Sequence, residues 1–199
     1  MNKFLNLSWL ARGLFSVLAL LYIILAVQFI WHDGLATFAS DSSNYLVMAR
    51  YLSPWQPPSA PITEIWSLQY FPPLFPLLLG LSGRASNLPA AHVFTFFLLG
   101  LSLPLLYRYL ATLLDSAFQA LILTSLFVLS PSTWLNILGI LSENLYLLLS
   151  LGCLLLYPRL SNSKVLQSVL FGVMLGALLL TRTIGIAMFG AYLMACLPR

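Results

Sequence analysis

Long apolar segments, interrupted by very few charged residues, are the feature that most constrains how this chain can fold. Of its 199 residues, 60% are hydrophobic and 7% are charged. A soluble domain carries roughly 25% charged residues, because a surface in contact with water needs them. This chain has too few charged residues to form such a surface. We therefore predict an all-α, polytopic integral membrane protein that forms a single transmembrane module over residues 1–199.

Six apolar segments are long enough, or nearly so, to cross a bilayer as helices, which takes about 20 residues. A further apolar stretch, residues 72–81, is too short to cross and opens with two prolines, so we interpret it as a re-entrant segment. The six predicted spans are Leu14–Trp31, Leu88–Leu110, Ala117–Leu129, Asn136–Tyr157, Val165–Leu180 and Ile184–Leu197.

Basic residues near the ends of the predicted spans set the expected orientation. Lysine and arginine accumulate in the short loops on the cytoplasmic side of a membrane. Lys3 and Arg12 precede the first span, and Arg159 and Lys164 lie between the fourth and the fifth. We therefore expect a cytoplasmic N-terminus and, after the first span, a long outer loop over residues 32–87.

This first outer loop is far longer than the usual connection of about 4–6 residues, and its aromatic residues argue against disorder. Ser40 or Asp41 can cap the start of a helix in its first half. We predict an interfacial helix over residues 41–52, with its apolar side among the lipid headgroups. Asp41 is one of only five acidic residues. It is explained either as a helix cap or as a carboxylate with a chemical role, and the two are compatible.

Two further ionisable residues are expected close to the outer face. Glu143 lies within the fourth predicted span, on a polar stripe with Asn136 and Gly139. Because burying an ionisable group in a bilayer is costly, it predicts a functional site, the alternative being a structural glutamate bonded to a neighbouring helix. Arg182 follows the fifth predicted span, where it is either a headgroup anchor or a clamp for a phosphate.

Taken in order, four short segments resemble the N-terminal part of a GT-C type membrane glycosyltransferase. The resemblance covers nearly the whole chain. It is to the group of protein O-mannosyltransferases, aminoarabinose transferases and dolichyl-phosphate-mannose-protein mannosyltransferase-like proteins. The segments that carry it are Asp41–Arg50, Tyr70–Pro76, Leu141–Asn144 and Leu180–Gly185.

The resemblance implies transfer of a sugar from a polyprenyl-phosphate donor, on the periplasmic or extracellular face of a bacterial inner or cell membrane. It places the catalytic acid at Asp41, as a general base that works alone or with a divalent metal. Glu143, with Asp33 as a second candidate, would line the cavity and orient the acceptor or the metal. Arg182 would hold the donor phosphate. Members of the group usually continue with further spans, so we expect a truncated, N-terminal module.

Other functions are weighed against this one. No basic run in the sequence suits a phosphate backbone, so we expect the lipid-linked donor and membrane lipid as partners and no nucleic acid. The alternative is a non-catalytic transporter, flippase or assembly subunit that binds a lipid phosphate. Transporters typically have broken helices at corresponding positions of two halves, and only Pro72-Pro73 suggests such a break in this sequence.

Overall fold

The computed structural model describes residues 9–32, 40–55, 70–158 and 165–196. These residues form helices joined by turns and contain no strand, so the prediction of an all-α fold is confirmed for them. The helices are α1 (Trp9–His32), α2 (Ser40–Leu52), α4 (Leu74–Leu81), α5 (Leu88–Leu113), α6 (Ala117–Leu129), α7 (Pro131–Leu138), α8 (Glu143–Leu156), α9 (Val165–Thr181) and α10 (Gly185–Cys196).

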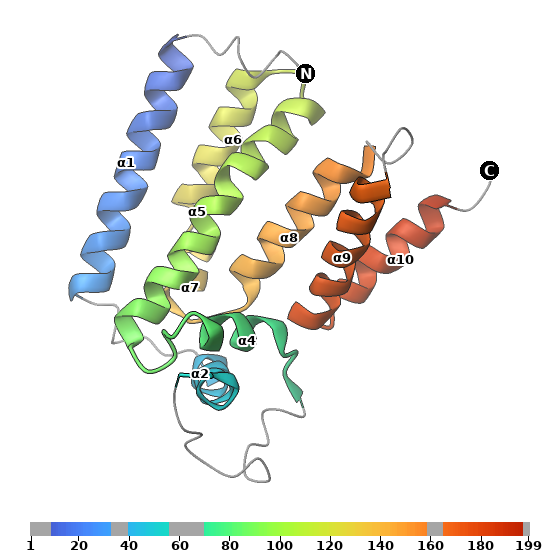
Figure 1. Ribbon diagram of the computed structural model, residues 1–199. Coiled ribbons are helices and arrows are strands. Elements are labelled where there is room, and N and C mark those ends of the chain that lie inside the picture. Colours follow the sequence, from blue (N-terminus) through green and yellow to red (C-terminus); the bar gives the residue numbers. More distant parts are fainter. Residues whose placement is uncertain (1–8, 33–39, 56–69, 159–164, 197–199) are drawn as a thin grey trace.

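The longer helices lie side by side, and α2 and α4 lie across one end of them (Figure 1). In this bundle α5 packs against α1, α6 and α8, while α9 packs between α8 and α10. The short helix α4 contacts both α2 and α9. We call the end covered by α2 and α4 the capped end. It also contains the start of α8 and the turn between α9 and α10 (Figure 1).

Among the described residues, one helix is long and apolar enough to cross a bilayer, judged by length and composition. This helix is α5, with 26 residues. It begins where the side chain of Asn87 accepts a hydrogen bond from the amide of Ala90, and Pro89 fits its first turn because no amide partner is needed there. The shorter apolar helices include α6, α8 and α9. These findings support association with a membrane, and the number of crossings stays a prediction.

The fourth predicted span, Asn136–Tyr157, is wrong as one continuous helix. Helix α7 ends at Leu138 and α8 begins at Glu143, so residues 139–142 form a break. The backbone of Gly139 is extended there, with φ −95° and ψ 152°. Glu143 therefore lies in the first turn of a helix, and not in the interior of a span as the sequence suggested.

A hydrogen bond from a distant part of the chain stabilises this break. In a continuous helix the amide of Ile140 would donate to a carbonyl of the preceding turn. It donates instead to the Oγ of Ser42 on α2, at 3.0 Å. Because the helix is interrupted, the predicted polar stripe of Asn136, Gly139 and Glu143 on one helical face does not form.

Helices α2 and α4 approach each other closely because Gly80 carries no side chain. A Cβ at this position would collide with the backbone carbonyl of Ala49. Beside this contact, the rings of Tyr45 and Phe75 meet edge to face, with centroids 5.2 Å apart. Met48 and Ala49 are fully buried. The apolar side of α2, which the sequence suggested for the lipid headgroups, is thus covered by protein.

Candidate functional site

Asp41 lies in the first turn of α2, which begins at Ser40, one residue before the predicted start. Its side chain is exposed, and a carboxylate at this place is stabilised by the positive end of the helix dipole. The next residue, Ser42, is buried and bonds the amide of Ile140. This bond fixes the start of α2 against the break between α7 and α8, and so holds Asp41 beside that break.

One turn further along α2, Tyr45 makes a second connection to the break. Its hydroxyl hydrogen-bonds the Oγ of Ser142 at 2.9 Å, across 97 positions of sequence. Both residues are buried, and Ser142 directly precedes Glu143. Two hydrogen bonds from α2 therefore hold the backbone segment from which Glu143 projects.

Burial raises the pKa of Tyr45 above its ordinary value of 10.0. The hydrogen bond from Ser142 opposes this rise, while the negative charge of Glu143 adds to it. The positive charge of Arg182 lowers the same pKa, and the charge of Asp41 raises it slightly. The phenol thus stays protonated at neutral pH, within electrostatic reach of all three charged side chains.

The carboxylate of Glu143 forms an ion pair with Arg182, in which Nη1 of the guanidinium contacts Oε1. Arg182 directly follows α9, in a tight turn where its carbonyl accepts a hydrogen bond from the amide of Gly185 at 2.9 Å. A Cβ on Gly185 would collide with the carbonyl of Leu178, so this turn requires glycine. The two charged side chains are 37% and 31% exposed, which places the pair at an accessible edge of the protein.

The capped end thus brings together three charged residues that the sequence singled out from separate segments. Asp41 comes from α2, Glu143 from α8 and Arg182 from the end of α9. The fourth candidate, Asp33, lies outside the described residues. Sequence reasoning did not identify Tyr45 and Ser142 as parts of this site. The available signals were that Tyr45 follows Asp41 by one helical turn and that Ser142 adjoins Glu143.

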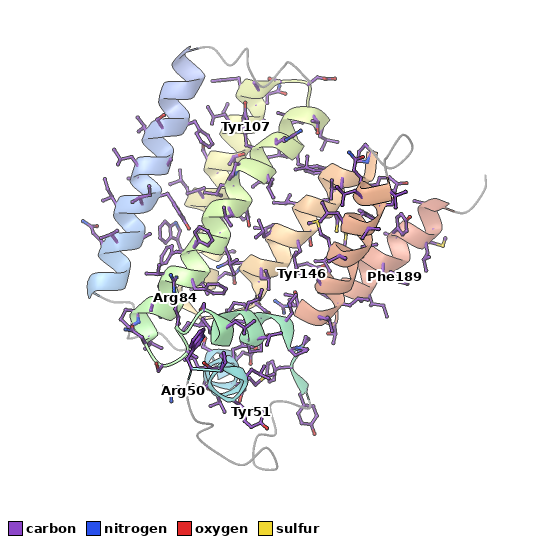
Figure 2. All side chains as sticks on the ribbon, viewed as in Figure 1. Arg50, Tyr51, Arg84, Tyr107, Tyr146 and Phe189 are labelled. Atoms are coloured by element: carbon purple, nitrogen blue, oxygen red, sulfur yellow. The ribbon has the colours of Figure 1, made fainter. Side chains whose placement is uncertain are left out.

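Other basic residues at the capped end have different partners. The Nε of Arg50 donates to the carbonyl of Ala85 at 3.2 Å, which links α2 to the turn before α5. Figure 2 shows Arg50 and Arg84 at this end of the molecule and Tyr107 at the opposite end. Arg50 thus binds a backbone carbonyl, whereas Arg182 pairs with the carboxylate of Glu143.

The described residues do not assemble a complete set of metal ligands. No three histidine, cysteine, aspartate or glutamate side chains come together in them. Divalent cations such as Mg²⁺ and Ca²⁺ are held by several oxygen ligands, of which carboxylates are the charged ones. The divalent metal at this site stays a prediction.

A pocket of about 220 Å³ lies beside Glu143, between α5, the α6–α7 connection, α7 and α8. The Oε2 atom of Glu143 is buried and has no hydrogen-bond partner among the described residues. Asn136 and Glu143, which were predicted to share a helical stripe, meet at this pocket instead. Its polar lining residues are Ser130, Ser132, Thr133, Asn136, Glu143 and Asn144.

Comparison of the chain with models of known protein families, with curated proteins and with solved structures finds no match. The function is therefore argued from the chemistry of the capped end. That end offers a carboxylate at a helix start, a guanidinium at a helix end and a small pocket that Glu143 lines.

Proposed function

We propose that this chain is a lipid-linked-sugar glycosyltransferase of the GT-C type, or the N-terminal module of one. In this proposal the chain crosses the membrane six times, and the capped end lies at the outer face, where a lipid-held donor and a water-borne acceptor can meet. The observation that carries the proposal is the ion pair of Glu143 with Arg182, held next to Asp41 by hydrogen bonds from α2.

Arg182 is suited to hold the phosphate of the donor. A guanidinium carries five N–H donors in a planar fork that matches the oxygens of a phosphate. The contact with Glu143 involves Nη1, so the guanidinium has further donors for a ligand. Its partial exposure leaves it accessible from the edge of the bundle.

Asp41 is suited to act as the general base. Its carboxylate would accept the proton of an acceptor hydroxyl while the hydroxyl oxygen forms a bond to the anomeric carbon of the donor sugar. The bond between that carbon and the phosphate oxygen breaks, and its electron pair leaves with the polyprenyl phosphate. Arg182 stabilises the negative charge on the departing phosphate.

Tyr45 keeps the arrangement rigid without adding charge. A tyrosine is neutral at the pH of a cell envelope, and burial raises the pKa of Tyr45 further, so the phenol does not repel a phosphate nearby. Its bond to Ser142 orients the segment that carries Glu143, and Glu143 in turn positions Arg182. We therefore assign Tyr45, Ser142 and Glu143 positioning roles.

The proposed phosphate site is tested by the affinity of the purified protein for a short-chain polyprenyl phosphate. Arg182→Gln should weaken binding at least about tenfold, since a hydrogen bond to a charged group contributes roughly 1.5–3 kcal/mol. The matched control is Arg84→Gln, which removes an arginine from the same end of the molecule (Figure 2). Equal affinities for the wild type and Arg182→Gln would contradict the proposal.

A second candidate function is a non-catalytic protein that binds a lipid phosphate, namely a transporter, flippase or assembly subunit. The break at residues 139–142 favours it, because discontinuous helices commonly form the substrate sites of transporters. The two candidates differ in the product formed. A glycosyltransferase moves a radiolabelled sugar from the lipid to a hydroxyl acceptor, whereas the second candidate binds or translocates the labelled lipid and leaves the sugar attached.

A further inference from the structure

The surface of the pocket beside Glu143 is mostly apolar, with polar atoms at a few places. Leu99, Phe127 and Leu147 supply apolar surface, while serine, threonine, asparagine and glutamate residues supply oxygen and nitrogen atoms. Its volume of about 220 Å³ is below the roughly 300–1,000 Å³ of sites for drug-sized ligands. The occupant is therefore a single small group and not an extended molecule.

The two carboxylate oxygens of Glu143 have different surroundings. Oε1 contacts the guanidinium of Arg182, whereas Oε2 is buried and finds no hydrogen-bond partner in the part of the chain that the structure describes. A buried acceptor without a partner is costly, and a ligand that donates a hydrogen bond to it removes that cost. Because Glu143 also lines the pocket, a ligand there is a direct source of such a donor.

Two of the other polar groups of the pocket donate a hydrogen bond inside the protein. Thr133 donates its only hydroxyl hydrogen to the carbonyl of Phe127 at 2.7 Å. The amide of Asn144 donates to the carbonyl of Thr95 at 3.3 Å. The serine hydroxyls and the other asparagine amide that line the pocket can both donate and accept. The pocket therefore suits a small ligand that donates and accepts hydrogen bonds, and its one carboxylate disfavours an anion.

A sugar ring meets these requirements. Its hydroxyl groups donate hydrogen bonds at its edge, and its C–H groups pack against apolar and aromatic side chains. A sugar joined to a phosphate also needs a cation next to its ring site. Arg182 contacts the carboxylate of Glu143, and Glu143 also lines the pocket, so a phosphate at the guanidinium and a ring in the pocket would be neighbours.

We propose that this pocket holds the sugar ring of the lipid-linked donor, with Glu143 accepting a hydrogen bond from a ring hydroxyl and Asn136 lining the site as a specificity-determining residue. The inference rests on the proposed function, because it takes the donor phosphate to lie at Arg182. It adds to that function a separate subsite, on α7 and α8, that recognises the sugar.

The experiment compares polyprenyl phosphate with polyprenyl-phosphate mannose, glucose and arabinose, each binding to the purified protein. The wild type should bind at least one sugar-bearing lipid about tenfold more tightly than the bare lipid, because a hydroxyl–carboxylate bond is gained. Asn136→Leu, which fills the pocket with apolar volume, should abolish this preference and leave the affinity for the bare lipid unchanged. Leu135→Phe is the matched control, because it adds volume on the same helix at a side chain that is 65% exposed.

The outcomes separate this inference from the proposed function. If the wild type binds none of the lipids, the proposed function fails. If it binds the bare and all sugar-bearing lipids equally, the phosphate site stands and the sugar subsite is overturned. A preference that survives in Asn136→Leu also overturns it. Ser132→Val, at an exposed position of the first turn of α7, provides a second pocket variant that does not depend on the folding of Asn136→Leu, and it should reduce the same preference.

Discussion

The capped end and the groove between α8, α9 and α10 share α8 and α9 but are built in opposite ways. At the capped end, side chains from distant segments make directional polar contacts, such as Tyr45 with Ser142 and Arg182 with Glu143. The groove toward the other end of α8 and α9 encloses about 170 Å³ and is lined almost wholly by apolar groups. There the rings of Phe171 and Tyr192 pack with centroids 4.9 Å apart.

The difference between these regions shows where the chain fixes its geometry. Apolar packing is non-directional and tolerates repacking, whereas a buried polar group requires a partner at a defined place. The chain has few charged residues, and the paired polar groups at the capped end are those with positions suited to bind a ligand. The groove between α8, α9 and α10 contributes packing, and the capped end contributes the proposed site.

The largest effect on stability is expected from Gly80→Ala. The added Cβ would collide with the carbonyl of Ala49 and separate α2 from α4, which should lower the free energy of unfolding by about 2–3 kcal/mol. Gly176→Ala on α9 is the matched control, since nothing lies within 4 Å of its Cβ. The Gly176→Ala change should be neutral or slightly stabilising, because alanine favours a helix. Unfolding in detergent micelles measures the stability of both variants. Equal losses of stability would show that the close contact at Gly80 does not set the capped end apart.

A smaller loss is expected from Ser42→Ala. This change removes the acceptor of the Ile140 amide and leaves a buried N–H group without a partner, at a cost of about 1–2 kcal/mol. Ser43→Ala, at the neighbouring exposed position, should cost less, because water can replace a lost partner there. Chemical unfolding of the two variants side by side checks this. A loss as large for Ser43 as for Ser42 would show that the bond to the buried Ile140 amide has no special weight.

Tyr45→Phe should cost about 1 kcal/mol, because Ser142 loses its hydrogen-bond partner. The effect should also depend on pH. The folded-state pKa of Tyr45 is raised above 10.0, so its contribution to stability is complete below pH 10 and is lost as the pH rises through the raised value. Stability curves above pH 10 should therefore fall more steeply for the wild type than for Tyr45→Phe. Parallel curves would place this phenol in a solvated environment.

The smallest expected effect is the coupling between Glu143 and Arg182. Because both side chains are about one-third exposed, solvent screens the pair, and a double-mutant cycle with glutamine at each position should give about 0.5 kcal/mol. A coupling above about 2 kcal/mol would mean that the pair is structural and stabilises the fold. The expected small value, combined with a large loss of lipid binding, fits a functional pair.

Sequence reasoning identified the helices well wherever the apolar pattern and the capping residues agree. The start of α5 at Leu88 and both ends of α6 follow from such signals, and α2 begins one residue before the predicted start. The break at residues 139–142 was not predictable in this way, because Ile140 and Leu141 continue the apolar run of the neighbouring helices. A hydrogen bond to a serine 98 positions away decides the local structure there.

The charged members of the candidate site were identifiable from the sequence because charge is rare in this chain. The contacts that they make with one another were not identifiable in this way. The ion pair needs the turn at Gly185, and the pocket needs α7 to diverge from α8. Tyr45 and Ser142 carry no charge, so the scarcity of charged residues does not single them out as candidates. Their roles depend on the packing of α2 across the end of the bundle.

The proposed role of Asp41 is tested most directly by the rate of sugar transfer from a polyprenyl-phosphate donor in membranes that contain the protein. Asp41→Asn preserves the shape of the side chain and removes the base, so transfer should fall by at least about 100-fold. Asp115→Asn is the matched control, because it makes the same change in the turn after α5, where a φ of 53° also suits asparagine. Transfer that is lost in Asp41→Asn and retained in Asp115→Asn is the predicted result. Equal transfer by the wild type and Asp41→Asn would contradict the account.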